Sequence, residues 1–124
     1  MFTINGIIWK VKVVRPDYPL LLQPNGNFAI GVCDNNYKII CISSKIRGKA
    51  FKQVLCHEIV HAAMFSYNII IDHDTEEFIA NLISKYGHEI VHITDKMFKQ
   101  IKKRGYLNGI PIIFMPNLFH YLID

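Results

Sequence analysis

The hydrophobic pattern alternates in the first third of the chain and becomes helical afterwards. Residues 7–14 alternate apolar and lysine side chains at their centre and are rich in β-branched residues, which predicts a half-buried strand. Two further apolar runs, 28–33 and 38–43, flank the turn residues 34–36 (Asp-Asn-Asn). That arrangement predicts a hairpin.

From residue 49 onward, apolar side chains recur every three or four positions and predict three helices. The first runs over 49 to about 67. The second begins at Asp74 or Thr75, either of which can cap it, and ends at Gly87. The third carries the apolar positions from 90 to 101 and ends at Gly105.

These elements predict an α+β fold in a single domain over 1–124. A small antiparallel sheet of about three strands packs on the first helix, accompanied by the two further helices. A chain of 124 residues is long enough to bury roughly two thirds of its unfolded surface in one core. Residues 106–124 form an apolar tail. We expect this tail to pack on the body, to join subunits in an oligomer, or to lie across the cleft.

Composition narrows the class of protein. The net charge is +4, but no basic–aromatic motif accompanies the lysine runs, so we expect solvated helix faces and no nucleic-acid partner. Three cysteines without a C-x-x-C spacing argue against a disulfide framework and suit a reducing compartment. There is no signal-peptide pattern and no apolar run of about 20 residues. We therefore expect a cytoplasmic protein without a membrane span.

Candidate chemistry lies in the first helix, where His57-Glu58-Ile59-Val60-His61 reads H-E-x-x-H. Two histidines four positions apart project from one helix face. Their imidazoles can take two corners of a zinc tetrahedron, and Glu58 can act as general base on an activated water. The same five letters recur at 88–92, so one copy has to be chosen.

A catalytic zinc needs a third protein ligand and one open position. After the first copy in the sequence, five candidate ligands lie near the start of the next helix: Asp72, His73, Asp74, Glu76 and Glu77. Behind the second copy there is no glutamate, and Asp95 lies on the same helix as His88 and His92. The first copy is therefore the predicted metal site. The metzincin extension is excluded, because its glycine and third histidine would fall at Met64 and Tyr67.

Residues 54–62, followed by Glu77-Phe78-Ile79-Ala80-Asn81, resemble the ImmA/IrrE-like metallopeptidases of phages and mobile elements. In that family H-E-x-x-H is followed by E-x-x-A-N or a close variant. The resemblance covers roughly residues 9–103 and is strongest over 54–87. It implies a zincin-like fold of minimal gluzincin type, with Zn²⁺ held by His57, His61 and Glu77. Glu76 and His73 stay open as alternatives to Glu77.

The predicted function is zinc-dependent hydrolysis of a protein or peptide, such as a repressor, with Glu58 as base. The alternative is a metal-stabilised module that binds a repressor or toxin without cleaving it; the presence of Glu58 favours the enzyme. Asn81, one turn past Glu77, is a candidate to orient a ligand. In peptidases of this kind, the strand over 38–43 would present the edge on which substrate lies. Candidates to stabilise the oxyanion are His88, His92, Tyr86 and Tyr106.

Two further residues are expected to be structural. Cys56 adjoins His57, but neighbours on a helix point about 100° apart, so a buried, inert thiol is expected. Trp9 is expected in the core.

Overall fold

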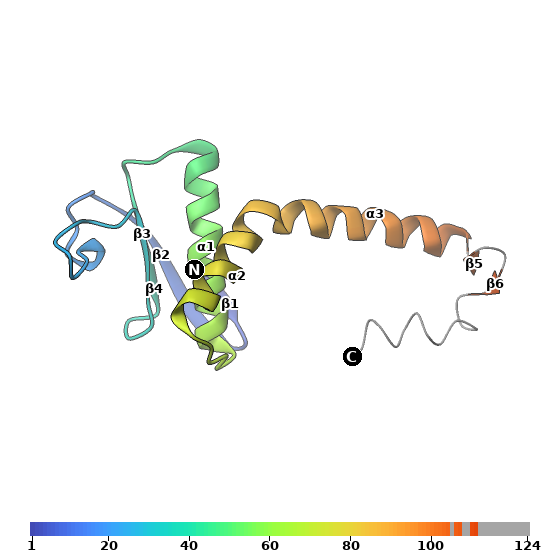
Figure 1. Ribbon diagram of the computed structural model, residues 1–124, viewed down its shortest axis with the longest axis horizontal. Helices are drawn as coiled ribbons and strands as arrows, with labels where there is room; N and C mark the ends of the chain where they lie inside the picture. Colours follow the sequence, from blue (N-terminus) through green and yellow to red (C-terminus); the bar gives the residue numbers. More distant parts are fainter. Residues whose placement is uncertain (105, 108–109, 112–124) are drawn as a thin grey trace. The chain divides into compact units, whose positions relative to one another are not determined.

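The computed structural model describes residues 1–104, 106–107 and 110–111 (Figure 1). Contacts divide the chain into two units, Met1–Gly87 and His88–Asp124. The first H-E-x-x-H copy and the acids that follow it all belong to the first unit. The expectation of one domain over 1–124 stays a prediction.

The first unit is built on a sheet of four strands in the order β1-β2-β4-β3. The strands are β1 (Phe2–Ile4), β2 (Ile7–Val14), β3 (Gly31–Asp34) and β4 (Ile39–Ser43). The neighbours β1–β2 and β3–β4 are antiparallel, whereas β2 and β4 are parallel. The α+β class and the β3–β4 hairpin are confirmed. The about three-stranded antiparallel sheet is not, because the sheet is mixed.

The parallel pairing follows from the path of the chain between β2 and β4. After β2 the chain passes through a short 3₁₀ turn, η1 (Pro19–Leu21), and reaches the far edge, where β3 begins. The hairpin then returns β4 into the space between β3 and β2, so that Lys10 pairs with Ile39 and Val14 with Ser43. Strand β3 runs opposite to β2, and β4 runs opposite to β3, so β4 runs in the same direction as β2.

Strand β4 is, with β2, one of the two interior strands of this sheet, and all five of its residues are buried. Ile40 and Ile42 join a cluster that includes Trp9, on the face toward the first helix. Ile39 and Cys41 face the opposite side and pack with Leu21. The prediction that this strand presents a free edge is wrong. Among the described strands, β3 pairs only with β4 and forms one edge of this sheet, and β1 forms the other.

Helix α1 (Gly48–Ser66) lies between the sheet and α2 (His73–Leu82), as Figure 1 shows. Ala62 of α1 packs in the sheet cluster. Val60 and Met64, on another side of α1, pack on Ala80 of α2. The second helix ends earlier than predicted and continues as a π-helical turn, η2 (Ile83–Gly87). Helix α1 is thus the element that both the sheet and α2 hold in place.

The start of α2 is capped two or three residues earlier than predicted. Asp72 is the N-cap and accepts hydrogen bonds from the backbone N–H of Thr75 at 2.9 Å and from its hydroxyl at 2.6 Å. These hydrogen bonds lower the pKa of the Asp72 carboxyl. The prediction of Asp74 or Thr75 as cap is wrong, because Asp72 already satisfies the free amide of Thr75.

Trp9 is fully buried, which confirms its predicted place in the core. Its indole Nε1 donates a hydrogen bond of 2.8 Å to the hydroxyl of Ser66, the last residue of α1. Asn5, in the turn before β2, donates from Nδ2 to the carbonyl of the same serine at 3.0 Å. The end of α1 is therefore tied to the β1–β2 hairpin.

The second unit contains α3 (His88–Arg104) and an antiparallel pair, β5 (Tyr106–Leu107) with β6 (Ile110–Pro111). The third helix is thus confirmed. The apolar tail predicted over 106–124 lies, apart from these two short strands, outside the described residues. Within the described ranges, no helix combines the length and the apolar character needed to cross a membrane.

Candidate metal centre

His57 and His61 stand one turn apart on α1, and their side chains meet. The ring centroids are 4.9 Å apart, with an interplanar angle of 63°. The two Nε2 atoms lie 3.1 Å from each other. The four-residue spacing therefore brings two imidazole nitrogens to one point, as predicted.

Glu77, in the first half of α2, completes this point. Its Oε1 lies 2.8 Å from Nε2 of His61, and its Oε2 lies 3.2 Å from Nε2 of His57. Donor atoms of His57, His61 and Glu77 all fall within 4.8 Å of one another, and this group could bind a metal ion. The close approach of the two helices depends on Ala80, whose small side chain is fully buried against α1.

The chemistry of this donor set fits a divalent cation. Two imidazole nitrogens and one carboxylate are ligands that Zn²⁺ takes in catalytic sites. The group also borders a cavity of about 300 Å³ lined by residues of β3, α1 and α2: Gly31, Val32, Cys33, Glu58, His61, Phe65, His73, Glu76 and Glu77. This cavity offers space beside the donors for a water or a substrate group, as an open coordination position requires.

Glu76 takes a different position from its neighbour. Its Oε2 lies 2.7 Å from Nδ1 of His61, the nitrogen on the opposite side of the ring from Glu77. A proton on Nδ1 would be donated to this carboxylate and would leave Nε2 free to bind a metal. Glu76 and His73 were the alternatives to Glu77 as third ligand. Glu76 contacts Nδ1 of His61, on the side of the ring away from the donor group. His73 lines the cavity but does not belong to the three-residue group.

Glu58 is the buried acid of the centre, with 7% of its surface exposed. Burial raises the pKa of its carboxyl to about 7; the neighbouring His61 lowers it and the negative charge of Glu77 raises it. The side chain lies against the backbone of β3, because a Cβ built on Gly31 would stand 3.3 Å from Cγ of Glu58. The edge strand and the predicted base are therefore in direct contact.

Cys33 lines the same cavity. No motif in the sequence includes this cysteine, so the sequence did not predict its place in the site. Burial, together with the charges of Glu58, Asp34 and Glu76, raises the pKa of its thiol to about 12. The thiol is therefore protonated at neutral pH. Cys56 is partly rather than fully buried and is not part of the donor group.

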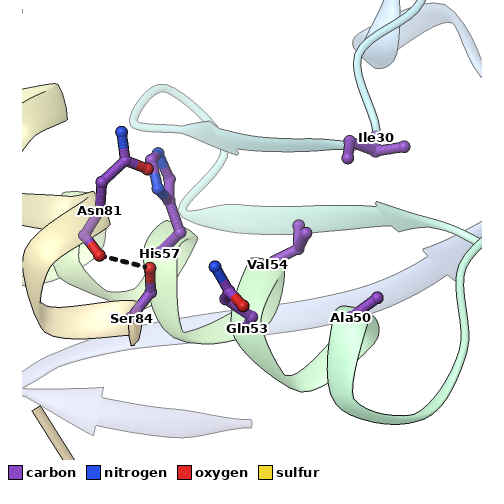
Figure 2. A pocket seen from close by; sticks show the side chains of 7 residues that line it. All are labelled: Ile30, Ala50, Gln53, Val54, His57, Asn81 and Ser84. Carbon is purple, nitrogen blue, oxygen red and sulfur yellow. Dashed lines mark hydrogen bonds between the residues drawn. The ribbon is translucent and has the colours of Figure 1, made fainter. Parts of the chain in front are cut away.

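Asn81 lies beside His57 in a second pocket, which Figure 2 shows from close by. Its backbone carbonyl accepts a hydrogen bond of 3.0 Å from the hydroxyl of Ser84. The hydrogen bonds of the described residues include none from its side chain to His57 or His61. Its role in orienting a ligand stays a prediction.

The second H-E-x-x-H copy forms the first turns of α3. The rings of His88 and His92 stack with centroids 6.4 Å apart. Over residues 1–104, 106–107 and 110–111, no third histidine, cysteine or acid completes a group with them. Tyr86 is half exposed in η2, and Tyr106 lies in β5. The oxyanion roles of these residues stay predictions.

Comparisons of the chain with protein-family models, with curated proteins and with solved structures found no match. The interpretation of the site therefore depends on its own geometry and on the chemistry of its donor atoms.

Proposed function

We propose that this chain is a zinc-dependent metallopeptidase of the ImmA/IrrE-like kind, with a zincin-like active site. His57, His61 and Glu77 would hold the metal, and Glu58 would be the general base. The observation that carries the proposal is the position of Glu58, a buried carboxyl with a pKa of about 7 in the cavity that the donor group borders. A metal site with a purely structural role has no use for such a residue.

When bound, zinc supplies Lewis acidity, which activates water for attack and polarises a carbonyl group. Glu58 accepts a proton from the attacking water and delivers it to the nitrogen of the leaving amine. In the metal-free chain burial raises the pKa of the Glu58 carboxyl to about 7. The positive charge of bound zinc would lower this pKa, so that the ionised carboxylate is available to accept the proton. Glu76 holds His61 through Nδ1 and fixes the direction of its ring.

The edge strand β3 supports a peptide as the substrate class. An extended peptide can add to a free sheet edge through main-chain hydrogen bonds. Gly31, Val32 and Cys33 of β3 line the cavity of the donor group, so a strand paired with them would pass over it. A protein substrate such as a repressor, as the family resemblance implies, would present such a segment.

The proposal is tested by comparing Glu58→Gln with wild type for zinc content and for cleavage of a denatured protein substrate. The matched control is Glu89→Gln, which makes the same change in the second copy of the motif. We expect Glu58→Gln to keep zinc and to lose roughly 10²- to 10⁴-fold in rate, whereas Glu89→Gln keeps both. Equal cleavage by wild type and Glu58→Gln would refute the proposed peptidase function and favour a metal-stabilised binding module.

A further inference from the structure

Helix α3 carries an apolar face that is exposed in the described part of the chain. Five large apolar side chains of this helix keep between 46% and 63% of their surface exposed: Ile90, Val91, Ile93, Met97 and Phe98. None of the hydrophobic clusters formed by the described residues includes a residue of α3. The proposed peptidase chemistry makes no use of this helix, so the exposed face calls for another explanation.

The order of residues in α3, a continuous helix of 17 residues (Figure 1), separates apolar from polar side chains around the helix axis. Over 88–103, with about 100° between neighbours, the apolar residues and one threonine fall within an arc of about 160°. In order around the axis they are Ile93, Met97, Ile90, Ile101, Thr94, Phe98 and Val91. Every residue of 88–103 outside this arc is polar or charged. Helix α3 is therefore amphipathic.

The basic residues of α3 are gathered in its second half. Residues 96–104 contain four lysines and an arginine and no acid, whereas the two acids of the helix, Glu89 and Asp95, precede them. All four lysines are exposed: Lys96, Lys99, Lys102 and Lys103. The ion pairs found among the described residues include none from α3. This half of the helix therefore presents positive charge that the described chain does not neutralise.

A second copy of the chain is a poor match for this face. Two paired helices bury a narrow apolar seam of about two positions in seven, whereas the apolar arc of α3 is broad. The 17 residues of α3 hold little more than two heptads, fewer than the roughly three or four that mark a coiled coil. In a parallel pair the two basic halves would also lie side by side and repel each other.

An anionic membrane surface matches both the width of the apolar arc and the charge beside it. A broad apolar arc opposite a lysine-rich face is typical of helices that lie in the membrane interface. Lys102 is next to Val91 around the axis and stands at the border of the arc. A lysine there can rest its hydrocarbon stem on apolar surface while its ammonium group reaches a lipid phosphate.

We propose that α3 binds to the surface of membranes that contain anionic phospholipids, with its axis in the plane of the interface. The apolar arc enters the boundary between headgroups and acyl chains, and the basic half contacts the phosphates. The helix does not cross the bilayer, because its 17 residues extend over roughly 26 Å, less than the hydrocarbon core. The proposal is independent of the proposed peptidase function, since the metal donors lie on α1 and α2.

The test uses the full chain and vesicles of two compositions, phosphatidylcholine alone and an equal mixture of phosphatidylcholine and phosphatidylglycerol. Partition coefficients are measured by sedimentation of the vesicles. The chain should bind the mixed vesicles about ten-fold more tightly than the neutral ones, and this binding should weaken as the salt concentration rises. Absence of binding, or equal binding to the two compositions, would overturn the proposal.

A pair of phenylalanine variants tests the apolar face. Phe98→Ser removes the largest apolar side chain of the arc and should lower the partition coefficient about ten-fold. The matched control is Phe78→Ser in α2, because Phe78 is 66% exposed and Phe98 is 63% exposed; this variant should bind as wild type does. An equal loss in both variants would show that α3 is not the binding surface. Self-association that Phe98→Ser alone abolishes, without vesicle binding, would assign the face to a second copy instead.

A pair of charge variants tests the basic half. Lys102→Glu combined with Lys103→Glu should lose nearly all binding to the mixed vesicles, because acids replace two of the cations beside the apolar arc. The control combines Lys49→Glu with Lys52→Glu, two exposed lysines of α1, and should keep most of the binding. Both variants change the net charge of the chain by the same amount. A similar loss in both would show that the vesicles sense only the total charge, and the assignment to α3 would be wrong.

Discussion

Nδ1 of His61 and Oε2 of Glu76 are 2.7 Å apart, which is the shortest contact in the metal centre. The carboxylate stands behind the ring, and Glu77 stands in front of it at 2.8 Å from Nε2. Two consecutive glutamates of α2 therefore contact the same histidine ring at its two opposite nitrogens. One is placed to bind the metal and the other to hold the ligand.

Substitution of these two glutamates should have different effects on zinc affinity. Glu77→Ala removes a donor atom and should abolish stoichiometric binding. Glu76→Ala leaves three donors but frees the ring of His61, and should weaken binding about 10- to 100-fold. Asp74→Ala, an exposed acid of the same turn, is the control and should bind as wild type. Competition with a chromophoric chelator measures the zinc affinity of all three variants. A larger loss of affinity for Glu76→Ala than for Glu77→Ala would show that Glu76 is the metal ligand and Glu77 the residue that holds His61.

Gly31 is the point where the edge strand meets α1. A Cβ on this residue would lie 2.7 Å from Cγ1 of Val54 and 3.3 Å from Cγ of Glu58. Gly31→Ala should therefore displace β3 or Glu58, which would cost about 1 to 3 kcal/mol of stability. Because Glu58 is the proposed base, the variant should also lose peptidase activity at unchanged zinc content. Denaturant unfolding measures the first effect.

A second substitution checks the cause. Val54→Ala removes the methyl group that Gly31→Ala would meet, so the double variant should be more stable than the sum of the two single losses predicts. Strict additivity of the two losses would show that this contact is not the origin of the effect.

Glu58 should make the metal-free protein lose stability as the pH rises. The pKa of its carboxyl is 4.5 when the group is free in water and about 7 in the folded chain. Below pH 4.5 both states carry the proton, and between these values the folded state alone retains it. Ionisation then favours unfolding, by about 3 kcal/mol once the pH exceeds 7.

The comparison of wild type with Glu58→Gln isolates this contribution, because the other titrating groups are shared. In the presence of a chelator, the unfolding free energy of wild type should fall relative to that of the variant between pH 4.5 and 7. Parallel pH profiles for the two proteins would show that Glu58 is not held protonated by burial.

Local patterns in the sequence were sufficient for much of this fold. The 3.6-residue period predicted α1, and the turn at 34–36 predicted the β3–β4 hairpin, because both signals lie within the segment they describe. The N-terminal hairpin had a local signal too. Asn5 and Gly6 both adopt positive φ, 49° and 77°, as a two-residue Asn-Gly turn requires, and this pair predicts the missed strand β1.

Other features depend on contacts between distant segments, and local patterns cannot supply them. The apolar run over 38–43 has the same composition whether it lies inside a sheet or at its edge. Its interior place follows from the parallel pairing with β2. Likewise, neither Glu76 nor Glu77 shows in sequence which nitrogen of His61 it faces. The packing of Ala80 against α1 decides that.

The central claim is that the first of the two H-E-x-x-H copies holds the metal, and zinc content tests it most directly. Zinc per chain should be measured on wild type, His57→Ala and His88→Ala after dialysis against a limiting concentration of the ion. The structure places Glu77 beside His57 and His61, so wild type and His88→Ala should each retain about one zinc per chain. His57→Ala should retain almost none. Loss of zinc from His88→Ala but not from His57→Ala would contradict the account.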